Sequence, residues 1–446
     1  MDIKVKPVIH VKKDEDCPGK PGILKPRCKT AAIICHGMGQ QVKFETLSFV
    51  SDIISNYGQE KDNVREADVR LIYHDNSKIP RAELTISDDE GNDRDIHLYE
   101  IYWASVTEGR VNAWHTLAFL IRSSRSAIWF SLKGSFERRI FGSKKKLPVK
   151  HYTSILVFIF LILLLALSLL YFAGIYISVV SIAAWIYGIT SGFIVMPLFR
   201  IFPASFFDLI ENNYNIFLII NLIAALFLLK GKSILKQYVG DVVAYVSSFR
   251  LSKFALIRAE IQKHAFDLAR FVYCLKKEGG ENIYEYDRII FIGHSLGSLI
   301  AYDTLNAIIN EFMATDGNSP AADRTKLLLT FGSPLDKTAF IFRNQKDNLP
   351  VREALAEATQ PMIQNYKYRP EEWINIYSNL DIISGYLDYY DDPHMKEDSP
   401  EGKKYWSKKI KNIKDWSCWI PFAAHNQYWK SKVLAESIMK ALKKTN

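Results

Sequence analysis

Residues 288–297 read RIIFIGHSLG. The first half is a nearly continuous apolar run that ends at Gly293, and such a run predicts a strand buried on both faces of a sheet. Apolar residues then recur at helical spacing over 299–312. Between strand and helix, the G-x-S-x-G pattern of Gly293, Ser295 and Gly297 predicts a sharp turn that lifts a hydroxyl out of the sheet, with glycines leaving room for the strained backbone and the packed helix. Ser295 is therefore the candidate nucleophile.

A second glycine-rich loop follows another apolar strand far upstream. Residues 30–35 (TAAIIC) predict a short buried strand, and residues 36–39 (HGMG) come directly after it. A loop of this kind can turn a backbone N–H, that of Met38, toward a developing oxyanion. The start of the helix that follows Ser295 offers a second N–H, that of Leu296. Met38 and Leu296 are therefore the predicted oxyanion donors.

The rest of the chain predicts strands that alternate with helices. Further strands are predicted at 69–73, 97–103, 327–330 and 373–377, helices at 253–277 and 430–442, and a polar, turn-like segment at 77–95. A strand with one face exposed to solvent would alternate apolar and polar residues, whereas these apolar runs are nearly continuous. The predicted fold class is therefore α/β, with a mostly parallel sheet covered by helices on both faces.

The order of strand, HGMG loop, strand, GHSLG turn and helix resembles the α/β-hydrolase family, in its lipase and esterase branch. The GHSLG form is also similar to the inositol-deacylase type of membrane hydrolase that acts on glycosylphosphatidylinositol. The resemblance covers roughly residues 30–105 and 240–430, and it is more specific for the fold than for the substrate. It implies an α/β-hydrolase fold and a loop-supporting role for both motif histidines. The supporting motif residues are His36, Gly37, Gly39, Gly293, His294 and Gly297.

The same family carries its catalytic triad in the chain order serine, acid, histidine. The acid follows a late strand, and the matching position is Asp381, just after 373–377. The base precedes the final helix, where the matching position is His425. The resemblance thus implies that Ser295 attacks an ester carbonyl, that His425 moves the proton and that Asp381 holds the imidazole. The alternatives left open are the acids Asp336, Asp388, Asp391 and Asp392 and the base His394.

A long uncharged segment separates the two parts of this resemblance. No charged residue occurs in 153–199, which predicts transmembrane helices at about 153–173 and 178–198. A shorter stretch at 212–229 either lies at the membrane interface or replaces the second span. Lys and Arg flank the segment on both sides, so the positive-inside rule places both ends in the cytoplasm.

The predicted organisation therefore has four parts. They are an N-terminal extension (1–29), a first part of the hydrolase domain (30–105), an insertion with transmembrane helices (106–250) and a second part of the hydrolase domain (251–446). The corresponding localisation is a multi-pass integral membrane protein whose catalytic domain faces the cytoplasm.

Composition narrows the function classes. The 446 residues include 57 Lys and Arg against 48 Asp and Glu, a net charge of +9. The positive residues cluster beside the uncharged segment without interleaved aromatic residues, which argues against nucleic-acid binding. Five scattered cysteines without a CxxC pattern argue against a disulfide framework and a zinc site. The proposed chemistry needs no metal or other cofactor, and no feature predicts the oligomeric state.

Together these observations predict a membrane-anchored serine hydrolase that cleaves carboxylic esters, with a lipid or lipid-like substrate. An acyltransferase or thioesterase would use the same triad and would differ only in the acceptor or the leaving group. A catalytically silent membrane scaffold is the alternative outside enzymology. A complete set of nucleophile, acid, base and both glycine motifs argues against that scaffold, because a silent copy has no chemical reason to keep them all.

Overall fold

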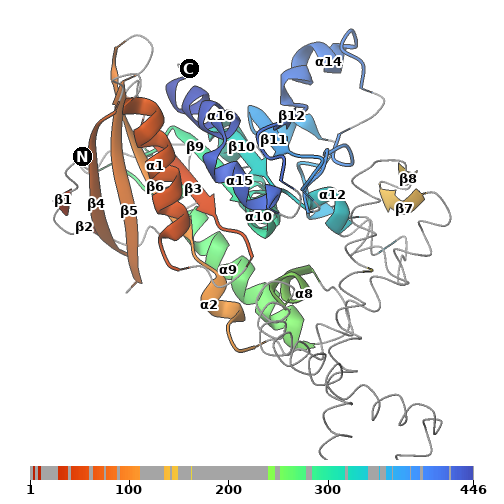
Figure 1. The fold of residues 1–446 in the computed structure, drawn as a ribbon, viewed down its shortest axis with the longest axis horizontal. Helices are drawn as coiled ribbons and strands as arrows, with labels where there is room; N and C mark the ends of the chain where they lie inside the picture. The colour runs from red at the N-terminus through yellow and green to blue at the C-terminus, as the bar shows by residue number, and fades with distance from the viewer. Residues whose placement is uncertain are drawn as a thin grey trace, which may run out of the picture.

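The chain folds around one large sheet with helices on both faces (Figure 1). The computed structural model describes residues 4–5, 9–11, 29–38, 42–59, 64–74, 77–87, 91–110, 135–140, 143–148, 162, 240–246, 252–277, 284–316, 320–339, 351, 358–363, 365–381, 383–391, 395–420 and 423–444.

The main sheet contains ten strands within the described residues. They are β1 (Lys4–Val5), β2 (Ile9–Val11), β3 (Thr30–Cys35), β4 (Val64–His74), β5 (Ser77–Ser87), β6 (Asp93–Ile101), β9 (Arg288–His294), β10 (Thr325–Phe331), β11 (Glu372–Tyr377) and β12 (Ile410–Lys414). Their order is β1-β4-β5-β6-β3-β9-β10-β11-β12, and β2 also pairs with β4. Strands β7 (Ser135–Ile140) and β8 (Ser143–Pro148) form a separate hairpin.

The helices connect these strands. They are α1 (Glu45–Gln59), α2 (Ala104–Thr107), α8 (Gly240–Val246), α9 (Ser252–Cys274), α10 (Leu296–Asp316), α11 (Pro320–Arg324), α12 (Leu335–Lys337), α14 (Pro400–Tyr405), α15 (Ala424–Gln427) and α16 (Lys432–Lys443). Three short 3₁₀ helices are η3 (Tyr366–Tyr368), η4 (Trp406–Lys408) and η5 (Tyr428–Lys430).

The central strands are buried on both faces, which explains their continuous apolar sequences. In β9, Ile289 and Phe291 pack with α8, α9 and α10 on one face. Ile290 and Ile292 pack with α1 and α16 on the other face. Figure 1 shows α1 and α16 side by side over the strands, in agreement with their direct contact. Each strand therefore supplies apolar side chains to two cores, as expected for parallel strands between helical layers.

Parallel pairing brings the ends of four strands to one edge of the sheet. Strands β3, β9, β10 and β11 run parallel, with Cys35 opposite Gly293, His294 opposite Phe331 and Phe331 opposite Ile376. The loops that leave the carboxyl ends of these strands therefore start side by side. Three of those loops carry His36, Ser295 and Asp381, which the sequence analysis singled out.

One strand departs from the predicted pattern. The segment predicted as polar and turn-like contains β5, which is antiparallel to both β4 and β6 and makes the sheet mixed. Arg81 and Glu83 of this strand are buried because they pair: the Arg81 guanidinium donates to Glu83 at 2.7 Å and to the Tyr286 hydroxyl at 3.2 Å. Its other face carries Leu84 and Ile86 into the core.

The predicted transmembrane insertion is not supported. The spans predicted at 153–173, 178–198 and 212–229 lie outside the described residues apart from Ile162, and no described helix is both long and apolar enough to cross a bilayer. A span needs about 20 mostly apolar residues, whereas the two longest described helices, α9 and α10, carry charged residues and pack on the sheet. The predicted fold, an α/β-hydrolase sheet interrupted by transmembrane helices, is corrected to an α/β fold on a mixed sheet. The predicted localisation as a multi-pass integral membrane protein is wrong on the same finding.

The sequence analysis argued against a disulfide framework, and one described cysteine nevertheless forms a disulfide. Cys274, at the end of α9, is disulfide-bonded. Cys35 and Cys418 are free and buried. The scattered spacing along the sequence gave no sign of this bond, because spacing does not report which cysteines meet in space.

Candidate active site

Ser295 occupies the turn between β9 and α10 in a strained conformation. Its φ is 53°, in the left-handed region that residues with a Cβ atom rarely adopt. The backbone N–H of Ser295 donates to the carbonyl oxygen of Phe331 at 3.0 Å, which ties the turn to the end of β10. Ser295 is only 1% exposed, and its Oγ has no hydrogen-bond partner among the described residues. A strained residue with an unused buried hydroxyl is typical of a functional site.

The two glycines of the motif allow the turn to pack closely. A Cβ atom at Gly293 would lie 2.7 Å from Cα of Ser298. A Cβ atom at Gly297 would overlap the carbonyl oxygens of Cys35 and His36 at the end of β3. Both positions therefore exclude any side chain, which agrees with the predicted reason for these glycines.

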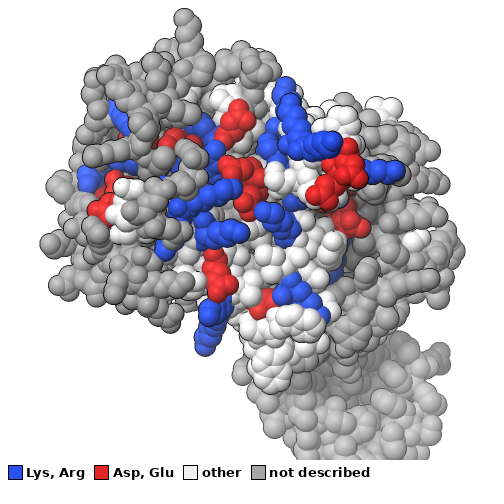
Figure 2. Space-filling model, turned by 90° about the horizontal axis from the view of Figure 1, so that it is seen from above, with Lys and Arg blue, Asp and Glu red and all other residues white. Residues whose placement is uncertain are grey.

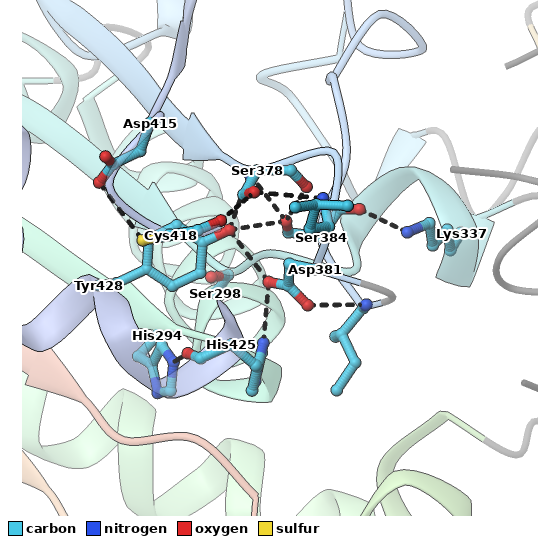
Figure 3. A network of polar contacts seen from close by, with 12 residues as sticks. His294, Ser298, Lys337, Ser378, Asp381, Ser384, Asp415, Cys418, His425 and Tyr428 are labelled. Atoms are coloured by element: carbon cyan, nitrogen blue, oxygen red, sulfur yellow. Dashed lines mark hydrogen bonds and ion pairs between the residues drawn. The ribbon is translucent and has the colours of Figure 1, made fainter. Parts of the chain in front are cut away.

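His425 and Asp381 form a buried hydrogen-bonded pair. Nδ1 of His425 lies 3.0 Å from Oδ2 of Asp381, and the carboxylate is 1% exposed (Figure 3). The other carboxylate oxygen accepts the backbone N–H of Ile383 at 2.9 Å. Burial raises the pKa of Asp381, but the His425 charge and hydrogen bond, with help from the nearby Lys337 ammonium, hold that pKa well below its usual range. Asp381 is therefore an anion beside His425.

The end of β10 brings this pair to the serine turn. Gly332 has a φ of 58°, and a Cβ atom there would lie 3.1 Å from Cε1 of His425. Phe331, the preceding residue, accepts the Ser295 N–H. Nε2 of His425 is buried and, like Ser295 Oγ, lacks a hydrogen-bond partner in the described part of the chain. Both residues that would exchange a proton thus contact the end of β10, and both of the atoms concerned lack a partner among the described residues.

His294 supports the His425 loop from β9. Its Nε2 lies 3.2 Å from the carbonyl oxygen of His425, so this nitrogen donates. The ring stacks on Phe331 and lies 4.9 Å from the His425 ring, centroid to centroid. Burial, and then the His425 charge, lower the pKa of His294 to about 3. His294 is therefore neutral at physiological pH, in agreement with the predicted supporting role.

The HGMG loop lies against the serine turn. A Cβ atom at Gly37 would lie 3.0 Å from Cβ of Ser295. His36 holds this loop: its Nδ1 donates to the Gly37 carbonyl oxygen at 2.8 Å, and its Nε2 accepts the Trp103 N–H at 3.1 Å. The His36 and Trp103 rings also stack 4.8 Å apart. Burial lowers the pKa of His36 to about 4, so this ring is neutral too.

Of the predicted oxyanion donors, Leu296 directly follows Ser295, and Met38 follows Gly37, which lies against the serine turn. Leu296 is the first residue of α10, so its N–H belongs to the helix start, where backbone donors have no partner inside the helix. Met38 follows Gly37 and is half-buried against the core. Gly39 lies outside the described residues.

Two of the alternative acids that the structure describes have other partners. Asp336 accepts the Asp388 N–H at 3.1 Å, and burial raises its pKa to about 7. Asp391 pairs with Arg369 instead. Asp392 and His394 lie outside the described residues. Of the described aspartates weighed as the acid, Asp381 is the one that contacts His425.

Three contributing residues were missed by the sequence analysis. Trp103 pins the HGMG loop, and no local signal marks it apart from its place at the end of a predicted strand. Lys337 is buried beside Asp381 and donates to the carbonyl oxygen of Ser384; burial lowers its pKa to about 8. Tyr428 donates to Asp381 at 3.0 Å. Its position three residues after His425 was a usable signal, because residues three apart lie on the same face of a helical segment.

A cavity of about 870 Å³ opens on another part of this edge. It is lined by residues of α9, of the β4–β5 hairpin and of the segment after β6, with Lys43 and Phe44 next to the HGMG loop. Its volume is typical of a ligand site. However, none of Ser295, Asp381 and His425 lines it, so this cavity is separate from the candidate active site.

Neither the surface charge nor the described metal-binding side chains indicate a further site. Lys and Arg side chains are interspersed with Asp and Glu over the described part of the face in Figure 2. No group of three or more His, Cys, Asp and Glu side chains suited to a metal ion occurs in the described ranges. The absence of nucleic-acid binding remains a prediction.

Comparison with known protein families, with curated proteins and with solved structures gives no match. The resemblance to α/β-hydrolases therefore rests on the GHSLG and HGMG motifs and the order of the elements around them. The roles of the site residues are proposals that this order and the geometry of the site support.

Proposed function

We propose that this protein is a serine hydrolase of α/β-hydrolase type that cleaves carboxylic esters. Ser295 is the nucleophile, His425 is the general base and then the general acid, and Asp381 holds and stabilises the imidazole. The N–H groups of Met38 and Leu296 are the proposed donors to the oxyanion.

One observation carries this proposal above the others. A serine in a left-handed backbone conformation stands between a strand and a helix, and a His–Asp hydrogen bond of 3.0 Å lies at the neighbouring strand end. Left-handed strain in a residue other than glycine persists where the surrounding structure requires it. Here the requirement is an Oγ that the turn lifts out of the sheet, toward a base and the N–H groups at a helix start.

The reaction follows from these positions. His425 Nε2 takes the Ser295 proton as Oγ forms a bond to the ester carbonyl carbon, and the carbonyl oxygen becomes an anion. When that intermediate collapses, the C–O bond to the alcohol breaks and His425 gives the proton to the leaving oxygen. Water then attacks the acyl-enzyme by the same route in reverse, which releases the carboxylic acid and regenerates Ser295.

The electrostatics support these roles. Asp381 is an anion across the working pH range, because its pKa is held below the usual value. It can therefore accept from His425 Nδ1 and leave Nε2 free to take a proton. His36 and His294 are neutral supports, since burial lowers both of their pKa values. His425 is thus the described histidine in position to move a proton.

Exposed apolar residues in the segment that precedes the base favour an ester with an apolar part. Trp416 and Trp419 are 76% and 65% exposed in the segment that leads to His425, and Ile420 accepts the N–H of Ala424 at the start of α15. Exposed large apolar groups next to a site are typical of ligand contact. A lipid-like acyl chain fits this surface, whereas the argument from transmembrane spans no longer supports such a substrate.

Covalent labelling with a fluorophosphonate serine probe tests the proposal. We expect labelling of the wild type and of Ser437→Ala, which removes a buried helix serine remote from the site. We expect no labelling of Ser295→Ala and much slower labelling of His425→Ala. If the folded wild type is not labelled, or if Ser295→Ala is labelled equally, Ser295 is not an activated nucleophile and the proposal is wrong.

A further inference from the structure

Two side chains converge on the same oxygen of Asp381. Oδ2 lies 3.0 Å from Nδ1 of His425 and also 3.0 Å from the hydroxyl of Tyr428 (Figure 3). Both donors come from one short segment, since α15 leads directly into η5. Asp381 is therefore clamped from a single helical turn.

The direction of these hydrogen bonds follows from counting donors and acceptors. The Tyr428 hydroxyl accepts the Ser378 N–H at 2.8 Å and lies 2.9 Å from Ser384 Oγ. An ionised carboxylate only accepts, and a phenol has one proton to donate. The Tyr428 proton therefore goes to Asp381, and the Ser384 hydroxyl donates to Tyr428.

The tyrosine is fully buried and stays protonated. Its side chain is 0% exposed and packs in the core beneath the site. Burial, and then the Asp381 charge, raise the pKa of Tyr428 well above its ordinary value. The hydroxyl is thus a permanent donor at any pH at which the enzyme works.

We propose that Tyr428 is a positioning residue of the triad: its hydroxyl holds the Asp381 carboxylate against His425 and takes up part of the negative charge that the imidazole would otherwise feel. This inference rests on the proposed function of the same site. On this proposal, the Tyr428 hydroxyl weakens the binding of a proton by His425.

Other charged and titratable groups face the same cluster from the surrounding elements. They are His294 from β9, Lys337 with Asp336 from α12, and Asp415 with Cys418 from the segment after β12. The test variant leaves all of them unchanged, so a change in pH dependence would report the loss of the hydroxyl.

The test is the pH profile of kcat/KM for hydrolysis of p-nitrophenyl butyrate by the full chain. In Tyr428→Phe the ring and its packing remain, but Asp381 loses one donor. With one hydrogen bond fewer, the negative charge of Asp381 then stabilises protonated His425 more strongly. We expect kcat/KM to fall by about tenfold or more, as when one hydrogen bond to a charged group is lost. We also expect the acidic limb to move to higher pH by about half to one unit.

Tyr302→Phe is the matched control. Tyr302 is equally buried, and its hydroxyl donates to Gln360, away from the triad. A purely structural role of Tyr428 would lower kcat/KM without moving the limb. We expect the acidic limb to stay where it is in Tyr302→Phe. An acidic limb that stays where it is in Tyr428→Phe, or that moves to lower pH there, would overturn the inference.

A second variant covers the case in which Tyr428→Phe does not fold. Ser384→Ala removes the donor to the Tyr428 hydroxyl without touching Asp381, so we expect a smaller shift in the same direction. No shift would count against the inference. Failure of the proposed function is recognised separately, because the wild type itself would then neither hydrolyse the ester nor react with the fluorophosphonate.

Discussion

Gly37 and Ser295 are in direct contact across two loops that lie far apart in the sequence. A Cβ atom at Gly37 would lie 3.0 Å from Cβ of Ser295 and 2.9 Å from Nδ1 of His294. The HGMG loop and the serine turn therefore pack closely against each other, so a shift of one loop would displace the other. This contact places Gly37, the residue before Met38, next to the proposed nucleophile.

Gly37→Ala is expected to lower activity more than stability. The added methyl group pushes the HGMG loop away from Ser295, which moves a proposed oxyanion donor, and loss of one donor costs about 10²–10³ in kcat. Ester hydrolysis and thermal unfolding measure the two effects. Gly385→Ala is the control, because a Cβ there meets only the Lys337 side chain, at 3.8 Å. Equal losses of activity in both variants would contradict the assignment.

Replacement of Ser295 by glycine should relieve the strain in the turn. The left-handed φ of 53° penalises a residue with a Cβ atom by about 1 kcal/mol or more relative to glycine. We expect Ser295→Gly to be more stable than Ser295→Ala by about 1 kcal/mol, while both are inactive. Denaturant unfolding measures the difference. In the α16 helix the order should reverse, with Ser437→Ala more stable than Ser437→Gly; the same order at both sites would show that the turn is not strained.

Asp381 should contribute stability that depends on pH with a defined sign. Its folded pKa lies below the unfolded value of about 3.9, so the contribution is present above that value and is lost as pH falls through the folded pKa. We expect the gap in unfolding free energy between wild type and Asp381→Asn to be constant above about pH 5 and to shrink below about pH 4. Activity of Asp381→Asn should fall by about 10⁴-fold.

The matched control for that experiment is Asp267→Asn. The Asp267 carboxylate pairs with Lys263 on the exposed side of α9, at 2.7 Å. Exposed pairs contribute little, so this variant should track the wild type over the whole pH range. A gap for Asp381→Asn that does not narrow in acid would mean that the Asp381 carboxylate is not selectively stabilised in the folded state.

The exposed tryptophans should affect esters according to chain length. Trp416→Ala and Trp419→Ala remove exposed apolar surface from the segment that precedes the base, so we expect KM for p-nitrophenyl octanoate to rise by about three- to tenfold, with little change for the acetate ester. Trp406→Ala is the control. Trp406 lies before β12 and Trp416 lies after it, so the two tryptophans stand at opposite ends of this strand. Equal effects on both esters would exclude an acyl-chain contact at this surface.

Much of the site could be predicted because its requirements are local. The turn at Ser295 needs glycines on both sides and a strand and a helix at its two ends, and all of these lie within a few residues. The pairing of Asp381 with His425 needed more, since 44 positions separate them. Family order suggested Asp381, but only the loop after β11 shows that Asp336 and Asp391 have other partners.

The errors have physical causes as well. Residues 77–95 looked like a polar turn because Arg81 and Glu83 interrupt the apolar pattern, yet pairing between these charges lets β5 enter the sheet. The uncharged segment looked like membrane spans because hydropathy is the usual signal for them. No described helix matches that reading.

The sequence by itself determined the buried parallel strands, the strained serine turn and the glycine loop beside it, because burial and backbone strain act within a few residues. Only the tertiary structure decided which carboxylate meets His425, how β5 buries its charges, and that Tyr428 shares an oxygen of Asp381 with His425. Those outcomes depend on where loops of different strands converge. Convergence is set by the register and packing of the whole sheet, which no local pattern records.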